Sequence, residues 1–202
     1  YASVSFLYWG CSFFGVRLAF DSGTLLLPIA YIFVDVLTEV YCFKHSRRVI
    51  WTGFGALALS AGAFSLIGAL PGEAAWQGYA GDAAYRAILG GMSSFGIVGA
   101  SLLAYFLGSY SNSVVMAVMK VATRGRFLWA RTIGSTLVGE LVDTLIFVLV
   151  ATLSGVFPWE AFSSLLLTNY LFKVAVEALF TPVTYGVVNG LKKAEHEDFY
   201  DR

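Results

Sequence analysis

The stretch YIFVDVLTEVYCFKHSRR, Tyr31 to Arg48, places two acidic residues inside an apolar run and ends in a cluster of positive charge. Asp35 and Glu39 are four residues apart, so they lie on one face of a helix. Like charges on one helical face repel each other unless a cation or a proton lies between them. The acids therefore indicate a functional role inside a membrane span, and the basic cluster is typical of a span end at the lipid head groups.

Apolar runs long enough to cross a bilayer recur along the whole chain. Of its 202 residues, 58% are hydrophobic and 13% are charged, against roughly 25% charged in a soluble domain. Because a span needs about 20 apolar residues, the pattern predicts an all-α polytopic membrane protein with a single domain over residues 1–202. We expect six transmembrane helices, at about residues 2–20, 24–43, 49–70, 86–109, 128–153 and 160–190.

The segments between these spans are short. The longest are 71–86 and 109–126, of which the second has room for a short surface helix, and residues 192–202 form a polar tail. Basic residues mark one side of the membrane: Lys44, Arg47, Arg48, Lys120, Arg124, Arg126, Lys192 and Lys193. The positive-inside rule makes that side the cytoplasm, so both termini of a six-span inner-membrane protein are cytoplasmic. Six spans also divide into two groups of three with opposite orientation, the plan of inverted-repeat transporters.

Five acidic residues lie inside the predicted spans. Asp35 and Glu39 are on the second span, Glu140 and Asp143 on the fifth, and Glu177 on the sixth. A carboxylate at the bilayer centre costs about 2.5 to 3.5 kcal/mol, so exposing all of them to lipid would offset the whole stability of a fold. We therefore expect the acids to converge inside the bundle.

One face of the sixth span is polar through most of the membrane, because polar residues recur at every fourth position: Asn169, Lys173, Glu177 and Thr181. Tyr170 lies beside this face. A purely structural alternative is that Lys173 and Glu177 neutralise each other one turn apart. Pro182 cannot donate a backbone hydrogen bond, which predicts a kink in this helix.

Two features of the fourth and fifth spans have more than one interpretation. Small residues on the fourth span recur at the same interval and form a smooth groove for close helix packing: Gly96, Ala100, Ala104 and Gly108. The sequence leaves open whether this groove packs within the chain or forms a homodimer. Arg131, near the start of the fifth span, is either a snorkelling anchor or a counter-ion for a buried acid.

The motifs of the common enzyme classes do not occur in the sequence. It contains no GxGD, GxSxG, P-loop, HExxH or dinucleotide-binding glycine pattern. His45 and His196 are too far apart for an evident metal site, and a formal net charge of zero gives no indication of nucleic acid as a partner. We therefore expect no cofactor and no enzyme, and active transport would run on a proton or sodium gradient or on trapping inside the cell.

The run LLLPIAYIFVDVLTEVYCFKHSRRVIWTGF resembles the signature of the VUT family, whose YhhQ members are queuosine precursor transporters. That signature has a proline, a tyrosine three residues later, a D-x-x-T-E-x-Y-G core and a K-x-x-R-R-x-I-W block. Two later stretches, RTIGSTLVGELVDTLIFV and NYLFKVAVEALFTPVTYGVVN, agree in style, so the resemblance covers about residues 25 to 190. Cys42 stands where the family has glycine, which affects helix packing there and leaves the acids in place.

The resemblance implies a six-helix inner-membrane importer for 7-deazaguanine bases, the 7-cyano and 7-aminomethyl precursors of queuosine. A carboxylate accepts the adjacent N–H donors of a guanine-type edge, and Asp35 or Asp143 is the candidate for that role. Glu39, Glu140 or Glu177 would meet the aminomethyl cation or carry a coupling proton. The remaining candidates are Asn169 for a carbonyl or ring nitrogen, Lys173 for a carbonyl or an acid, and Tyr31, Tyr170, Phe147 and Phe172 for stacking.

Two alternatives remain from the sequence. The same acids would serve a permease for another small base, a vitamin or a cation, which competition among deazaguanines, guanine and vitamins distinguishes. A non-transporting membrane enzyme or scaffold would use the polar stripes only to hold helices together. In that case, Asp35→Asn and Asp143→Asn would change folding yield and leave ligand binding untouched.

Overall fold

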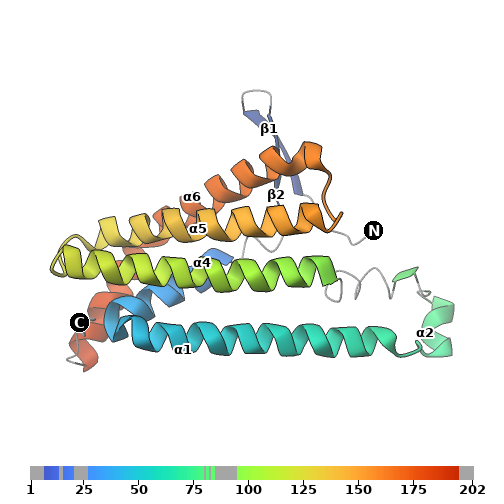
Figure 1. The fold of residues 1–202 in the computed structure, drawn as a ribbon, viewed down its shortest axis with the longest axis horizontal. Coiled ribbons are helices and arrows are strands. Elements are labelled where there is room, and N and C mark those ends of the chain that lie inside the picture. Colours follow the sequence, from blue (N-terminus) through green and yellow to red (C-terminus); the bar gives the residue numbers. More distant parts are fainter. Residues whose placement is uncertain are drawn as a thin grey trace.

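The computed structural model describes residues 7–13, 16–20, 27–79, 81, 83–84 and 95–195. Its main elements are two short strands and four long helices (Figure 1). In chain order, they are β1 (Leu7–Phe13), β2 (Val16–Phe20), α1 (Leu27–Ala69), the short α2 (Ala74–Tyr79), α4 (Phe95–Ala122), α5 (Leu128–Leu153), a 3-10 turn (Trp159–Ala161) and α6 (Phe162–Glu195).

Four of the described helices are long and apolar enough to cross a membrane: Ala30–Ala69, Phe95–Ala122, Leu128–Leu153 and Trp159–Ala194 with its 3-10 turn. Large apolar side chains cover their outer surfaces, among them Leu59 at 76% exposure and Leu179 at 75%. Such surfaces suit lipid and not water. The prediction of a polytopic, mainly helical membrane protein is therefore confirmed, whereas the number of six helices is not.

Helix α1 contains two of the predicted spans, and a sharp kink at Cys42 separates them. The backbone of Cys42 has φ 61° and ψ 169°, which is not helical. Thr38 Oγ1 lies 2.6 Å from Ser46 Oγ, although eight residues of straight helix would separate them by about 12 Å. The chain therefore folds back at Cys42, and residues 44–48, predicted to form a connecting loop, lie in the second helical segment.

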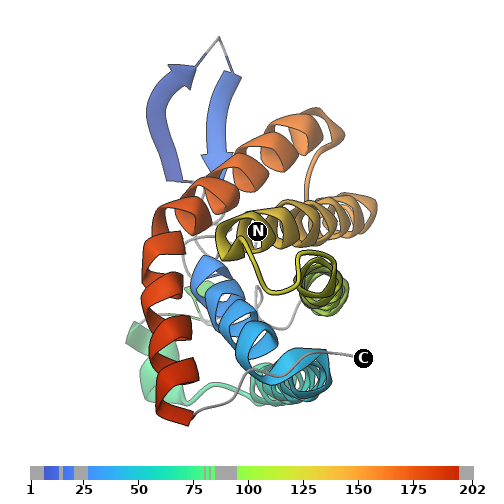
Figure 2. The same cartoon turned by 90° about the vertical axis from the view of Figure 1, so that its left-hand side faces the viewer.

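The predicted helix over residues 2–20 is wrong for the described part of that range. β1 and β2 form an antiparallel hairpin there, with Leu7 opposite Phe20 and Phe13 opposite Val16. The run is rich in aromatic residues, which favour strands, and hydropathy alone does not separate the two structures. β2 packs against α6 (Figures 1 and 2). Without this helix, the prediction of two inverted three-helix repeats is not confirmed.

Helix α4 also differs from the predicted boundaries of 86–109. It runs from Phe95 to Ala122, while residues 85–94 lie outside the described part of the chain. The connection predicted over 109–126 is therefore mostly helix, and its polar residues Ser109, Asn112 and Ser113 are buried. They are buried because short polar side chains can hydrogen-bond to neighbouring helices, an option that a polarity-based loop prediction ignores.

The small-residue groove of α4 packs against α5 within the same chain (Figure 1). A Cβ atom at Gly96 would lie 2.8 Å from the Cβ of Ser154, and one at Gly108 would lie 2.6 Å from the Cβ of Asp143. Ala100 and Ala104 between them are buried. Close helix packing along this stripe is therefore confirmed, and it brings the acidic face of α5 against α4.

One end of the bundle gathers the basic residues. The kink of α1, the α4–α5 connection and the end of α6 all lie at the left of Figure 1. These segments carry the eight basic residues that the sequence assigned to one side, so we call this part of the molecule the basic end. Helix α6 changes direction along its length (Figure 2) and contains Pro182, as the predicted kink requires.

Candidate functional site

The buried charged side chains form two clusters in the bundle. The acid cluster contains Asp35 of α1, Glu140 and Asp143 of α5, and Lys173 and Glu177 of α6, each no more than 5% exposed. The Glu39 cluster contains Glu39 of α1, Lys120 of α4, Arg131 of α5 and Lys192 of α6. The five predicted acids are thus all buried, as the cost of exposing them to lipid requires, but they do not form one site.

Lys173 is the cation of the acid cluster. Its Nζ atom forms an ion pair with Asp143 Oδ2, lies 3.1 Å from Glu140 Oε2 and donates to Thr144 Oγ1 at 3.4 Å. All three partners are on α5, so Lys173 reaches across to the neighbouring helix. The alternative was that Lys173 mainly neutralises Glu177 on its own helix. The structure does not show this pairing, because the ion pairs of Lys173 are with α5.

Asp35 and Glu177 are each held by one neutral donor. Asn112 Nδ2 donates to Asp35 Oδ1 at 2.6 Å, and Thr136 Oγ1 donates to Glu177 Oε1 at 2.5 Å. Within the described residues, Asp35 Oδ2 and Glu177 Oε2 are buried and no donor reaches them.

The charge balance of the acid cluster is negative. Four carboxyl groups face one lysine, so the cluster would carry three net negative charges if all were ionised. Such a charge is costly in a medium of low dielectric constant unless protons or a cationic ligand compensate it. In the described part of the chain, no group of three or more His, Cys, Asp or Glu side chains could hold a metal ion. Carboxyl groups in such an arrangement can accept hydrogen bonds, and they can take up protons or a cation.

The two tyrosines predicted for the site differ in burial, because Tyr31 is buried and Tyr170 is half-buried. Tyr31 is 2% exposed, and its hydroxyl lies where a side chain at Gly108 would be, 2.5 Å from a Cβ built there. That hydroxyl has no hydrogen-bond partner among the described residues. Tyr170 is half-buried and donates to the backbone oxygen of Leu137 at 3.2 Å.

Other residues predicted for the site lie on or near the polar face of α6 and in the apolar core. Asn169, Lys173, Glu177 and Thr181 are all buried, which confirms the polar face. Phe147, considered for stacking, instead packs edge-on against Phe157 in an apolar core cluster.

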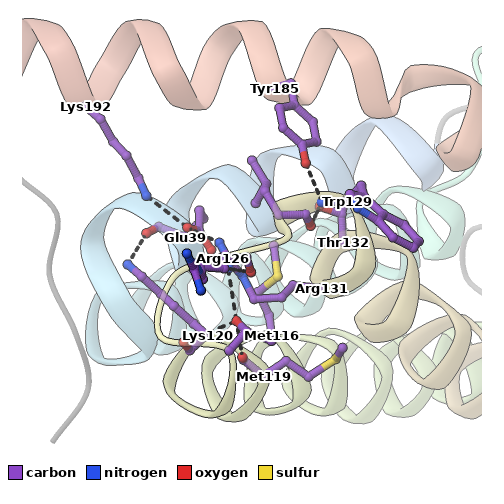
Figure 3. A network of polar contacts seen from close by, with 12 residues as sticks. Glu39, Met116, Met119, Lys120, Arg126, Trp129, Arg131, Thr132, Tyr185 and Lys192 are labelled. Atoms are coloured by element: carbon purple, nitrogen blue, oxygen red, sulfur yellow. Dashed lines mark hydrogen bonds and ion pairs between the residues drawn. The ribbon is translucent and has the colours of Figure 1, made fainter.

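Glu39 is surrounded by cations at the basic end (Figure 3). Its Oε1 atom accepts from Arg131 at 2.6 Å and from Lys192 at 2.9 Å, and its backbone oxygen accepts from Lys120 Nζ at 2.6 Å. Arg131 also donates to the backbone oxygen of Arg126 at 2.5 Å. Arg131 is therefore a counter-ion for a buried acid and not a snorkelling anchor. Glu39 holds four helices together and is separate from the acid cluster.

The sequence interpretation missed Asn112. It was placed in a connection after the fourth span, but it is fully buried in α4 and binds Asp35. A signal was present in the sequence, because polar and charged residues recur there at spacings of three, four and seven: Ser109, Asn112, Ser113 and Lys120. Glycine at position 139 lets α5 approach, since a Cβ there would lie 2.5 Å from the Cβ of Asn112.

Long apolar helices that enclose several carboxyl groups around one lysine are typical of multi-pass membrane proteins that bind or carry polar solutes. Sequence comparison agrees with this class. The chain belongs to the family described as "Putative vitamin uptake transporter", whose model matches residues 21–187. Family membership points to a transporter and not to an enzyme.

Two curated relatives are similar over most of the chain. A protein of Bacillus subtilis (strain 168) named "Probable queuosine precursor transporter" is 31% identical over 164 residues, which cover 81% of this chain and 69% of the relative. The "Queuosine precursor transporter" of Escherichia coli (strain K12) is 26% identical over 169 residues, which cover 82% and 71%. No solved structure gives a significant match.

Proposed function

We propose that the protein imports queuosine precursors, the 7-cyano and 7-aminomethyl 7-deazaguanine bases, across the inner membrane. The names of the two relatives support the substrate class. The observation that carries the proposal is the acid cluster, where Asp35 and Glu177 each keep one buried oxygen without a donor among the described residues. A flat base with several N–H donors and a cationic arm has the chemistry that such a cluster accepts.

The roles of the acids follow from their partners. Asp143 is paired with Lys173, so Asp35 is the better candidate for the edge of the base. Glu140 and Glu177 are the candidates for the aminomethyl cation or a coupling proton. Tyr31 is our candidate to stack on the base or donate to it, and Asn169 and Tyr170 are further candidates on α6. Glu39, which we considered for the substrate, has cationic partners that favour a structural role.

The orientation and energy source are part of the same proposal. We infer that the basic end faces the cytoplasm, because Lys and Arg are enriched in cytoplasmic segments, and this puts the polar C-terminal tail 192–202 inside the cell. The coupling ion in this proposal is a proton or sodium, and the buried carboxyl groups of the acid cluster are the candidates to carry it.

Uptake measurements test the proposal directly. Labelled 7-cyano and 7-aminomethyl 7-deazaguanine would be offered to cells without their own uptake route, which express either this protein or its Asp35→Asn variant at matched membrane abundance. Uptake should require the protein and be lost in the variant. Ser135→Ala is the matched control, because Ser135 is equally buried and bonds to Thr132 O and Met116 Sδ instead of the acids. Absence of uptake by the well-expressed parent protein would overturn the substrate class.

A second candidate is a permease for a vitamin, which the family description favours. Competition separates the two: unlabelled deazaguanines should reduce uptake of the labelled base, and unrelated vitamins should not. Competition by a vitamin at equal concentration would favour the second candidate.

A further inference from the structure

Asn112 of α4 lies directly beside the acid cluster and contacts it through Asp35. Its side chain is fully buried, and its Nδ2 atom donates to Asp35 Oδ1 at 2.6 Å. The Cβ of Asn112 lies against Gly139 of α5, where any side chain at position 139 would collide with it. The residue is therefore held from both sides, by a hydrogen bond on α1 and by close packing on α5.

The chemistry of Asp35 fixes the orientation of the Asn112 amide. An ionised carboxylate only accepts hydrogen bonds, so the amide must turn its NH2 group toward Asp35. This leaves the carbonyl oxygen Oδ1 as an acceptor, and no donor reaches it within the described residues. Asn112 Oδ1 thus joins Asp35 Oδ2 and Glu177 Oε2 as a third open, buried acceptor.

The three open acceptors belong to buried residues of one region. Asn112 binds Asp35, and Asp35 and Glu177 are both buried in the acid cluster. The other acids of the bundle already have cations, because Lys173 pairs with Glu140 and Asp143, and Arg131 and Lys192 pair with Glu39. Among the described residues, the open acceptors without a cation are therefore those of Asp35, Asn112 and Glu177.

We propose that Asn112 is a specificity-determining residue that reads the exocyclic amine of the base while Asp35 accepts from the neighbouring ring N–H. A guanine-type edge presents one ring N–H and two amine N–H groups side by side, which matches three open acceptors. A base without the exocyclic amine leaves Asn112 Oδ1 buried and unpaired, and a site built to bond a donor rejects the analogue that lacks it. This inference rests on the proposed function and assigns the part of the ligand that is recognised.

The experiment compares two ligands that differ only in this amine. Uptake of labelled 7-aminomethyl-7-deazaguanine would be competed with the unlabelled base and with its 2-deamino counterpart, for the parent, Asn112→Ala and Ser135→Ala proteins at matched membrane abundance. In the parent and in Ser135→Ala, the deamino base should compete roughly tenfold to a hundredfold more weakly. In Asn112→Ala, this ratio should fall to about twofold, because the KM of the amino base rises while the deamino base competes as before.

The outcomes separate this inference from the proposed function. Undiminished discrimination by a well-folded Asn112→Ala protein would overturn the role of Asn112. If the Asn112→Ala variant does not reach the membrane, the competition measured with the parent protein still tests the inference. Equal competition by the amino base and the deamino base would contradict it. Absence of uptake of any deazaguanine by the parent would remove the proposed function and this inference together, whereas uptake without discrimination would remove only the inference.

Discussion

Asp35 and Glu39 lie one turn apart on the same face of α1, yet they belong to clusters of opposite charge balance. Glu39 accepts from Arg131, Lys192 and Lys120, which come from three other helices. Asp35 accepts from the neutral Asn112, and the lysine of its cluster is shared between two other acids. The difference teaches that burial alone does not assign a role to an intramembrane acid. The partners of the acid assign its role. A buried acid that is paired with cations can link helices, whereas an acid without cations needs a proton or a ligand to compensate its charge.

The Glu39 cluster holds the basic end together. Besides Glu39, Arg131 contacts the backbone oxygen of Arg126 (Figure 3). It also donates to the hydroxyl of Thr123, and both contacts fix the connection between α4 and α5. Tyr185 of α6 accepts from the backbone N–H of Trp129 at 2.7 Å and ties the start of α5 to α6. Several elements therefore depend on one small group of side chains.

The largest effect is expected from breaking this group with Arg131→Met. Removing one partner of a buried ion pair typically costs about 3 to 5 kcal/mol, and Glu39 would lose its closest side-chain cation. Asp35→Asn, on the same helix face, should change the free energy of unfolding by less than about 1 kcal/mol, because an amide oxygen still accepts from Asn112. Unfolding of the purified proteins in detergent, followed by protease resistance, measures both.

A double variant controls for the loss of side-chain packing. Glu39→Gln combined with Arg131→Met removes both partners of this ion pair and should recover part of the stability. If Asp35→Asn destabilised the protein as much as Arg131→Met, charge compensation would not be what distinguishes the two clusters.

A smaller loss is expected when the acid cluster loses its lysine. Lys173→Met leaves Glu140 and Asp143 without their cation, at a cost of about 1 to 3 kcal/mol near neutral pH. Because the cost comes from negative charge, it should shrink as the pH falls and the carboxyl groups take up protons. Unfolding of parent and variant at about pH 7 and about pH 5 measures the difference, and a difference that grows on acidification would contradict the assignment of Lys173 as the compensating charge.

Sequence reasoning found the acids and misplaced some of the backbone that carries them. A charged residue inside an apolar run is visible one position at a time, so Asp35, Glu140, Asp143 and Glu177 were predicted to be buried, and they are. Their division into partners depends on contacts between helices that are far apart in sequence. Nothing in the spacing of Glu39 and Asp35 reveals that only Glu39 meets Arg131.

The errors share one cause, which is that hydropathy measures composition and not conformation. The apolar stretch over residues 2–20 has the hydropathy of a span, but strands occupy its described part. Asn112 lies in a more polar stretch that was interpreted as a connection, whereas α4 continues through it. The close packing of α4 on α5 was predictable because a glycine and alanine stripe has one physical use, the near approach of two helices.

The smallest effect concerns the kink that separates the Asp35 and Glu39 segment from the second half of α1. Cys42 has φ 61° and ψ 169°, a conformation that side chains other than glycine adopt at a cost of about 1 to 3 kcal/mol. The family signature has glycine at this position, which matches the backbone. Cys42→Gly should therefore stabilise the protein by about 1 kcal/mol after the extra chain entropy of glycine is deducted.

Cys42→Ala is the control, since it removes the thiol and keeps the Cβ, so it should bring no such gain. Thermal unfolding of the three proteins measures the difference. Equal gains from glycine and alanine would mean that the thiol, and not the backbone, is the source of strain.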